Sequence, residues 1–171
     1  RASFTTGATG QYTVVHNELT VDDGYIPLLA TNPIVTNSTT TVKINFVNHA
    51  NYDGGAGYCV FNDVAIAAQY LLDRGLANKI LIVDLDVHQG NGNSEIFKEN
   101  RNVFTFSMHS KSNYPAKKSI SDLDVELDDN MEDKQYIKVL KFYLNQLNEE
   151  SFDYVFYIAG VDIHFNDRLG K

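Results

Sequence analysis

The spacing of hydrophobic and polar positions predicts alternating strands and helices from residue 42 onward. Residues 79–85 (KILIVDL), 103–108 (VFTFSM) and 152–160 (FDYVFYIAG) are apolar runs typical of strands that are buried on both faces. Between residues 133 and 150, apolar side chains recur at helical spacing and make one stripe: Tyr136, Ile137, Leu140, Tyr143, Leu144 and Leu147. This alternation predicts an α/β fold, in which a parallel sheet is flanked by helices.

A further helix is predicted over residues 62–75 (NDVAIAAQYLLDRG), after a strand-like run at 42–47 (VKINFV) and a glycine-rich turn. Asn62 is placed to cap the helix, and Asp63 favours the positive end of the helix dipole. Gly75 is placed to end the helix.

The first part of the chain differs from the rest in composition and in hydrophobic pattern. Residues 1–41 are rich in Thr, Asn and Gly and show no sustained helical period. We expect an irregular N-terminal segment over 1–41 that contributes little to the core, followed by a partial α/β domain over 42–171.

Composition narrows the classes of partner. The chain has 171 residues and a net charge of -8, which argues against a nucleic-acid partner because such binding depends on Lys and Arg contacts to phosphates. A single cysteine, Cys59, excludes an internal disulfide framework. No apolar run is long enough to span a bilayer, and no stretch reads as a signal peptide. We therefore expect a cytoplasmic protein without a membrane partner.

The stretch VDLDVHQGNG at residues 83–92 carries the candidate chemistry. If the preceding strand continues, Asp84, Asp86 and His88 project to one side, because side chains alternate along a strand. Carboxylate and imidazole ligands together suit zinc or another divalent transition metal. Asp162 follows another predicted parallel strand and is the candidate third ligand, with His164 two residues further on.

Three other interpretations compete with a transition-metal site. A calcium loop starting at Asp84 would need Gly where Gln89 stands and an oxygen ligand where His88 stands. A dinucleotide site at residues 54–57 (GGAG) lacks its third glycine, because Val60 occupies that place. A solvated acidic loop does not explain alternating Asp, Asp and His after a buried strand.

Four separated blocks resemble the histone deacetylase superfamily, in particular its class IV-like bacterial members. They are NHANYDGGAGYCVFNDVAIAA, VDLDVHQGNG, VFTFSMHSKSNYP and AGVDIHFNDRLG, in this order and spacing. The resemblance covers residues 48–171 and implies an arginase/deacetylase-like fold. It also implies a zinc-dependent amidohydrolase that removes acetyl or other acyl groups from lysine side chains or small amines.

The resemblance also implies roles for individual residues. Asp86, His88 and Asp162 would be the Zn²⁺ ligands. His49 would be the general base and acid, with its ring oriented by Asn91. Further positions match the wall of an acyl-lysine channel, Gly57 and Tyr58, and a structural monovalent-cation site for which K⁺ is the candidate ion, Asp84 and Ser107.

Two departures bear on activity. Asn48 stands where the family has the first histidine of a pair, and Asn cannot carry a positive charge. The family's catalytic tyrosine lies in a Gly-rich loop beyond the position that matches DRLGK, so the resemblance leads us to expect a domain that is truncated at its C-terminus. The fragment alone is therefore expected to be weak or inactive. The alternative function is a catalytically silent module that binds acyl-lysine or serves as a scaffold.

Overall fold

The structure is a computed structural model that describes residues 4–6, 12–14, 42–43, 50–51, 53–56, 61–168 and 170. The chain divides into two compact units, Arg1–Thr40 and Thr41–Lys171. In the first unit, strands β1 (Phe4–Thr6) and β2 (Tyr12–Val14) pair in antiparallel fashion. Most of residues 1–41 lie outside the described residues, so the expectation of an irregular segment there stays a prediction.

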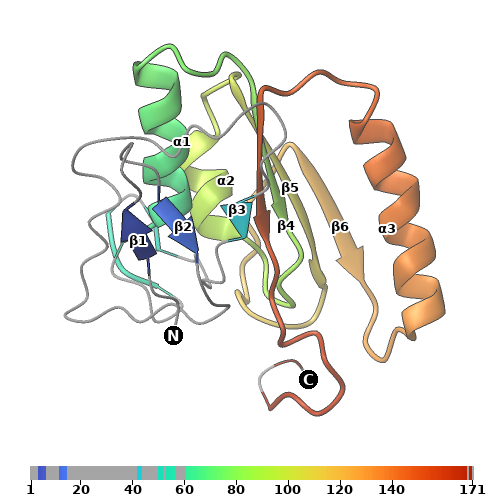
Figure 1. Cartoon of the computed structure of the whole chain (residues 1–171). Coiled ribbons are helices and arrows are strands. Elements are labelled where there is room, and N and C mark those ends of the chain that lie inside the picture. The colour runs from blue at the N-terminus through green and yellow to red at the C-terminus, as the bar shows by residue number, and fades with distance from the viewer. Residues whose placement is uncertain are drawn as a thin grey trace. The chain divides into compact units, whose positions relative to one another are not determined.

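The second unit contains a five-stranded sheet with the order β3-β7-β4-β5-β6, and each neighbouring pair is parallel (Figure 1). The strands are β3 (Val42–Lys43), β4 (Ile80–Asp84), β5 (Val103–Ser110), β6 (Leu123–Leu127) and β7 (Tyr154–Ile158). The helices are α1 (Asp63–Asp73), α2 (Asn91–Phe97) and α3 (Asp133–Leu147). The predicted α/β class with a parallel sheet is confirmed.

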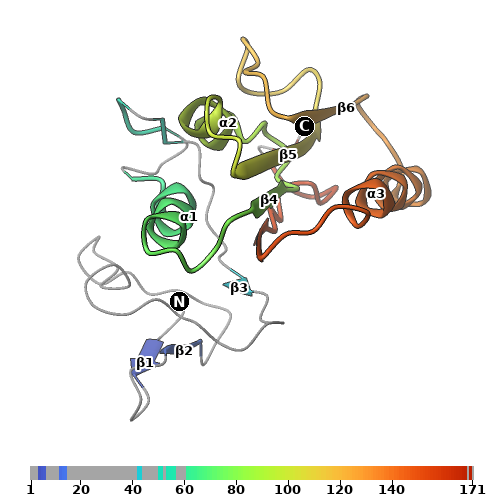
Figure 2. The same ribbon diagram turned by 90° about the horizontal axis from the view of Figure 1, so that it is seen from above.

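The helices cover both faces of the sheet, so β4 is buried on both sides. Ile80 and Ile82 belong to one apolar cluster with residues of α1 and α2. Leu81 and Val83 belong to a second cluster, which includes residues of α3. Figure 2 shows α1 and α2 on one side of β4 and β5, with α3 on the other. This double coverage explains why the sequence of β4 is continuously apolar.

The predicted ends of α1 are confirmed by its capping contacts. Asn62 is the N-cap, and its Oδ1 accepts a hydrogen bond of 2.9 Å from the backbone N–H of Ala65. Gly75 follows the helix with φ of +63°, a conformation that glycine adopts without steric cost. Asn62 also donates from Nδ2 to Asn93 Oδ1 at 3.0 Å, which joins the start of α1 to α2.

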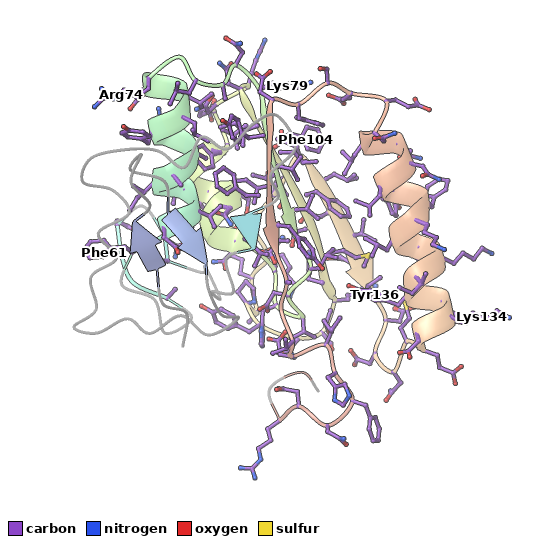
Figure 3. The ribbon with its side chains drawn as sticks, viewed as in Figure 1. Phe61, Arg74, Lys79, Phe104, Lys134 and Tyr136 are labelled. Atoms are coloured by element: carbon purple, nitrogen blue, oxygen red, sulfur yellow. The ribbon has the colours of Figure 1, made fainter. Side chains whose placement is uncertain are left out.

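The predicted apolar stripe of α3 is shifted by part of a turn. Val139 packs against the sheet, whereas Ile137 and Leu144 are 45% and 37% exposed. Positions 136, 140, 143 and 147 repeat along one helix face, and positions 137 and 144 lie about 100° to its side. Figure 3 shows Tyr136 on the side of α3 that faces the sheet and Lys134 on the outer side.

Two elements of the second unit were not predicted from the sequence, the short helix α2 and the strand β6. Both lie close to the candidate site, because α2 begins directly after the VDLDVHQG stretch and β6 pairs with β5. Of the helices that the structure describes, none combines the length and the apolar character needed to cross a membrane.

Candidate metal centre

Asp86, His88 and Asp162 converge at one edge of the sheet. Asp86 and His88 lie in the loop of residues 85–90 that follows β4, and Asp162 lies in the segment that follows β7. β4 and β7 are adjacent and parallel, with Asp84 opposite Ile158, so both segments leave the sheet at the same edge. One potential ligand atom from each of the three side chains lies within 4.8 Å of the others.

The His88 ring is held between the two carboxylates. Its Nδ1 lies 2.9 Å from Asp86 Oδ1 and 3.0 Å from Asp162 Oδ2. The carboxylates also fix the backbone, because Asp86 Oδ1 accepts the N–H of His88 at 2.8 Å and Asp162 Oδ1 accepts the N–H of Val87 at 3.1 Å. Asp86 is 1% exposed and Asp162 9%. The three side chains and the loop backbone therefore form one buried hydrogen-bonded unit.

This arrangement fits a divalent metal ion. Hydrogen bonds to Asp162 and Asp86 raise the pKa of His88 to about 9, against a smaller lowering by burial. The His88 nitrogen and two carboxylate oxygens thus already surround a position that favours positive charge. Two oxygen donors and one imidazole nitrogen make a donor set suited to zinc and similar ions, with a further position open to water or substrate.

The structure corrects the strand geometry that was predicted for this stretch. β4 ends at Asp84, and the following residues form bends rather than a strand. Asp84 Oδ1 accepts a hydrogen bond from the N–H of Asp86 at 3.0 Å. In the same way, Asp86 Oδ1 accepts a hydrogen bond from the N–H of His88. Two successive turns of this type, in which a side chain bonds the backbone two residues on, end the strand. Asp84 lies outside the ligand trio and orients Asp86.

Two glycines allow the backbone to approach the acidic side chains closely. A Cβ on Gly160 would lie 2.5 Å from Asp86 Cα and 2.8 Å from Asp86 Oδ2. A Cβ on Gly90 would lie 2.4 Å from Asp84 Oδ2. Any larger side chain at either position must displace the carboxylate, so both glycines are needed for the observed packing.

The residues matched to a monovalent-cation site, Asp84 and Ser107, are register partners on β4 and β5. Both are buried, at 3% and 2% exposed. Ser107 Oγ accepts the backbone N–H of Gly90 at 3.2 Å. The structure therefore brings this pair beside the metal-site loop, and its role in binding K⁺ stays a prediction.

Four predicted site residues, Asn48, His49, Gly57 and Tyr58, lie outside the described residues. Asn91 is described, and it is the first residue of α2. It is 8% exposed and donates from Nδ2 to Asn51 Oδ1 at 3.4 Å. His164 is exposed and does not join the ligand trio.

Sequence reasoning missed an aromatic neighbour of the site. The ring of Tyr114 meets the ring of His88 edge-on, with 6.2 Å between centroids, and Tyr114 is 49% exposed. The residue lies in the loop that follows β5, close to the edge where the trio gathers. An aromatic residue before a proline after a buried strand was the available signal in the sequence.

A surface pocket of about 560 Å³ lies beside α2. It is lined by residues of α2, including Glu95, by Glu99 just after the helix, and by Asp53 and Ser119. Among its described lining residues there is no member of the metal-ligand trio, so it is distinct from the metal centre. Asn91 lies between the two features, since it lines this pocket and follows the loop of His88.

Comparison with known proteins agrees with this geometry. The profile of the family described as "Histone deacetylase domain" matches residues 30–171, and so begins upstream of the Asn48 at which the resemblance was recognised. An uncharacterized protein of Picosynechococcus sp. is 50% identical over 125 residues, which is 72% of this chain and 42% of the relative. The acetylpolyamine amidohydrolase of Mycoplana ramosa is 52% identical over 62 residues, or 36% of this chain and 18% of that protein.

A solved structure shows the same likeness. The acetylpolyamine aminohydrolase of Burkholderia pseudomallei matches with a TM-score of 0.65 and 25% identity, over 71% of this chain and 39% of its own. The chain thus spans about two fifths of that protein and of the Picosynechococcus relative. Because the family profile covers most of the sequence and the fold agrees, the chain belongs to the histone deacetylase family.

Proposed function

We propose that the protein containing this chain is a zinc-dependent hydrolase that removes acetyl or other acyl groups from amines. The observation that carries the proposal is the convergence of Asp86, His88 and Asp162 at the sheet edge. Membership of the histone deacetylase family supports it, and so does the likeness to acetylpolyamine amidohydrolases.

Asp86, His88 and Asp162 would hold the metal ion through two carboxylate oxygens and the Nδ1 of the imidazole. When bound, zinc supplies Lewis-acid polarisation of the acyl carbonyl and makes water a stronger nucleophile. Asp84 keeps Asp86 in place through the backbone of the loop. With K⁺ bound, Asp84 and Ser107 would stiffen the same loop from the side of β5.

His49 is the proposed general base and acid. It would take a proton from the attacking water and return that proton to the amine nitrogen as the carbon–nitrogen bond breaks. Asn91 would orient the His49 ring, because its buried Oδ1 finds no hydrogen-bond partner in the described part of the chain. An Asn oxygen can accept a ring N–H and so select one tautomer.

The substrate proposed is an acylated lysine side chain or a small acylated amine. Gly57 and Tyr58 would form the wall of the channel for its methylene chain. Tyr114, half-exposed beside His88, is placed to provide a second aromatic surface. The net charge of -8 suits a substrate whose other groups are cationic.

The test compares His88→Ala with His164→Ala in the complete protein. Both changes remove one imidazole, but His88 contacts both carboxylates of the trio and His164 is exposed outside it. Release of acetate from an acetyl-lysine peptide and from an acetylated diamine is measured with zinc present. We expect His88→Ala to lower turnover at least about a hundredfold and His164→Ala to change it little.

Zinc-dependent turnover by the wild type that survives in His88→Ala would contradict the assigned site. If the wild type binds acyl-lysine peptide and zinc without any turnover, the silent binding module replaces the enzyme.

A further inference from the structure

A buried histidine outside the ligand trio contacts the metal-site loop indirectly. His109 lies near the end of β5, is 1% exposed and is the register partner of Glu126 on β6. Its Nδ1 lies 2.9 Å from Ser107 Oγ.

Ser107 connects His109 to the loop. Its Oγ accepts the backbone N–H of Gly90, two residues after His88, at 3.2 Å. An amide N–H can only donate, so this bond leaves the Ser107 hydroxyl proton available for an acceptor, and a neutral imidazole nitrogen is one. With the Ser107 hydroxyl as donor and His109 Nδ1 as acceptor, the 2.9 Å contact fixes the direction of the hydroxyl, and Ser107 Oγ in turn holds the N–H of Gly90.

Gly90 is a sensitive point in the loop. Its Cα packs against the Asp84 carboxylate so tightly that a Cβ would lie 2.4 Å from Oδ2. A second bond from β5 supports the same loop, because Ser110 donates its N–H to the Val87 carbonyl at 2.8 Å. The loop that presents Asp86 and His88 is thus held to β5 by two hydrogen bonds. In the middle of the loop, the Val87 carbonyl bonds the Ser110 backbone, and at its end the Gly90 N–H bonds the Ser107 side chain.

We propose that His109 is a positioning residue: acting through Ser107 and Gly90, it holds the loop so that His88 Nδ1 faces both Asp86 and Asp162. The role rests on the proposed metal site. It goes beyond that site, because His109 itself touches neither the ligands nor the substrate position.

The experiment compares His109→Asn with His109→Leu in the complete protein. The two side chains have similar size and both lose the ring, but Asn Oδ1 can take the place of Nδ1 as acceptor and Leu cannot. Co²⁺ binding is titrated by its visible absorption, in a buffer free of K⁺ and Na⁺ so that a monovalent ion at Ser107 does not contribute. The thermal unfolding of each metal-free variant is measured in parallel.

We expect His109→Leu to weaken Co²⁺ binding about tenfold, as loss of an indirect partner of a ligand does, and His109→Asn to stay within about threefold of the wild type. Ser107→Ala removes the hydroxyl that contacts both His109 and Gly90, so it should weaken Co²⁺ binding as much as His109→Leu does. Adding His109→Leu to Ser107→Ala should then cost little more, because each change removes the same contact. If His109→Leu does not fold, Ser107→Ala and His109→Asn carry the test, since the first removes the contact and the second keeps it.

Equal Co²⁺ affinities in His109→Asn and His109→Leu overturn the proposal. If both equal the wild-type affinity, His109 has no effect on the site. If both are lower and the melting temperatures are lower as well, the effect is a packing defect. Full binding by Ser107→Ala also overturns it. If the wild type itself binds no Co²⁺ or Zn²⁺, the proposed metal site fails and the role of His109 fails with it.

Discussion

His88 holds a proton at the position where a metal ion would replace it. Its pKa in the folded protein is about 9, above the ordinary value of 6.5, because two carboxylates face its Nδ1. Metal binding must therefore release this proton at any pH below about 9. We expect the apparent affinity for Co²⁺ to rise about tenfold per pH unit in this range and then to level off.

Calorimetric titration at several pH values measures this slope, and buffers of different ionisation enthalpy count the protons released. His164→Ala should keep the slope, because His164 lies outside the trio. An affinity that stays constant from pH 6.5 to about 9 would show that His88 is not protonated in the metal-free site.

Asn48 offers a second prediction on single residues. A histidine at this position, expected to face Asp84, would pair with the carboxylate and keep positive charge beside the metal. Such charge strengthens the stabilisation of a developing oxyanion. Because His49 remains to carry out proton transfer, the complete wild-type protein should be slow rather than inactive, and Asn48→His should raise kcat on an acetyl-lysine peptide by roughly tenfold.

Asn48→Gln is the matched control, since it changes the side chain and keeps it neutral. A wild type that is already fast, and slower with histidine, would show that Asn48 is adapted to its site and that the charge argument is wrong.

The sequence predicted some site residues and missed others for a physical reason. Asp86, His88 and Asp162 follow apolar strands, so the rule that parallel strands end at one edge was enough to bring them together. Tyr114, Gly160 and His109 depend instead on which loops and strands become neighbours in three dimensions. The alternation argument also assumed that the strand continues to His88, which is wrong because side-chain bonds to the backbone end it at Asp84.

At the scale of elements, the segment after β7 must pass directly over the loop after β4. Gly160 makes this possible, since a Cβ there would lie 2.5 Å from Asp86 Cα and 2.9 Å from Asp86 Cβ. Gly160→Ala should therefore push the segment that carries Asp162 away from Asp86. We expect Co²⁺ affinity to fall about ten- to a hundredfold, as for other changes that misplace a ligand.

Gly54→Ala is the control for this prediction, because a Cβ on Gly54 would meet nothing within 4 Å. Co²⁺ titration of both variants measures the difference. Equal affinities would mean that the two segments can separate without moving the ligands.

The two elements of the second unit that the sequence missed, α2 and β6, share a weak local signal. α2 begins with Asn-Gly-Asn, residues typical of turns, and its seven residues are too few to show a helical period. β6 (LDVEL) lies at the edge of the sheet and alternates polar with apolar residues, so it lacks the continuous apolar run of β4. Both are stabilised by their contacts with β5 and its neighbours rather than by local propensity.

At the scale of the molecule, a bound metal ion would link two segments that are far apart in the sequence. Asp86 and Asp162 come from loops that follow different strands, and the described contacts across this junction include the His88 ring and the Val87–Asp162 bond. A ligand that binds only the folded state stabilises it by about 2.7 kcal/mol at a hundred times its Kd. Adding Zn²⁺ should therefore raise the melting temperature of the complete protein, and a chelator should lower it.

The size of this effect should depend on pH in a defined direction. In the metal-free protein the folded pKa of His88 is raised, so the stability from its contact with the carboxylates is fully present below pH 6.5 and is lost as the pH rises through about 9. The metal-bound site needs the imidazole neutral, so its stability is not lost in this way. The increase in melting temperature on adding Zn²⁺ should thus be larger near pH 9 than near pH 6.5. Asp162→Asn should remove most of the increase at both pH values, and an increase that shrinks with pH would place the metal ion at other ligands.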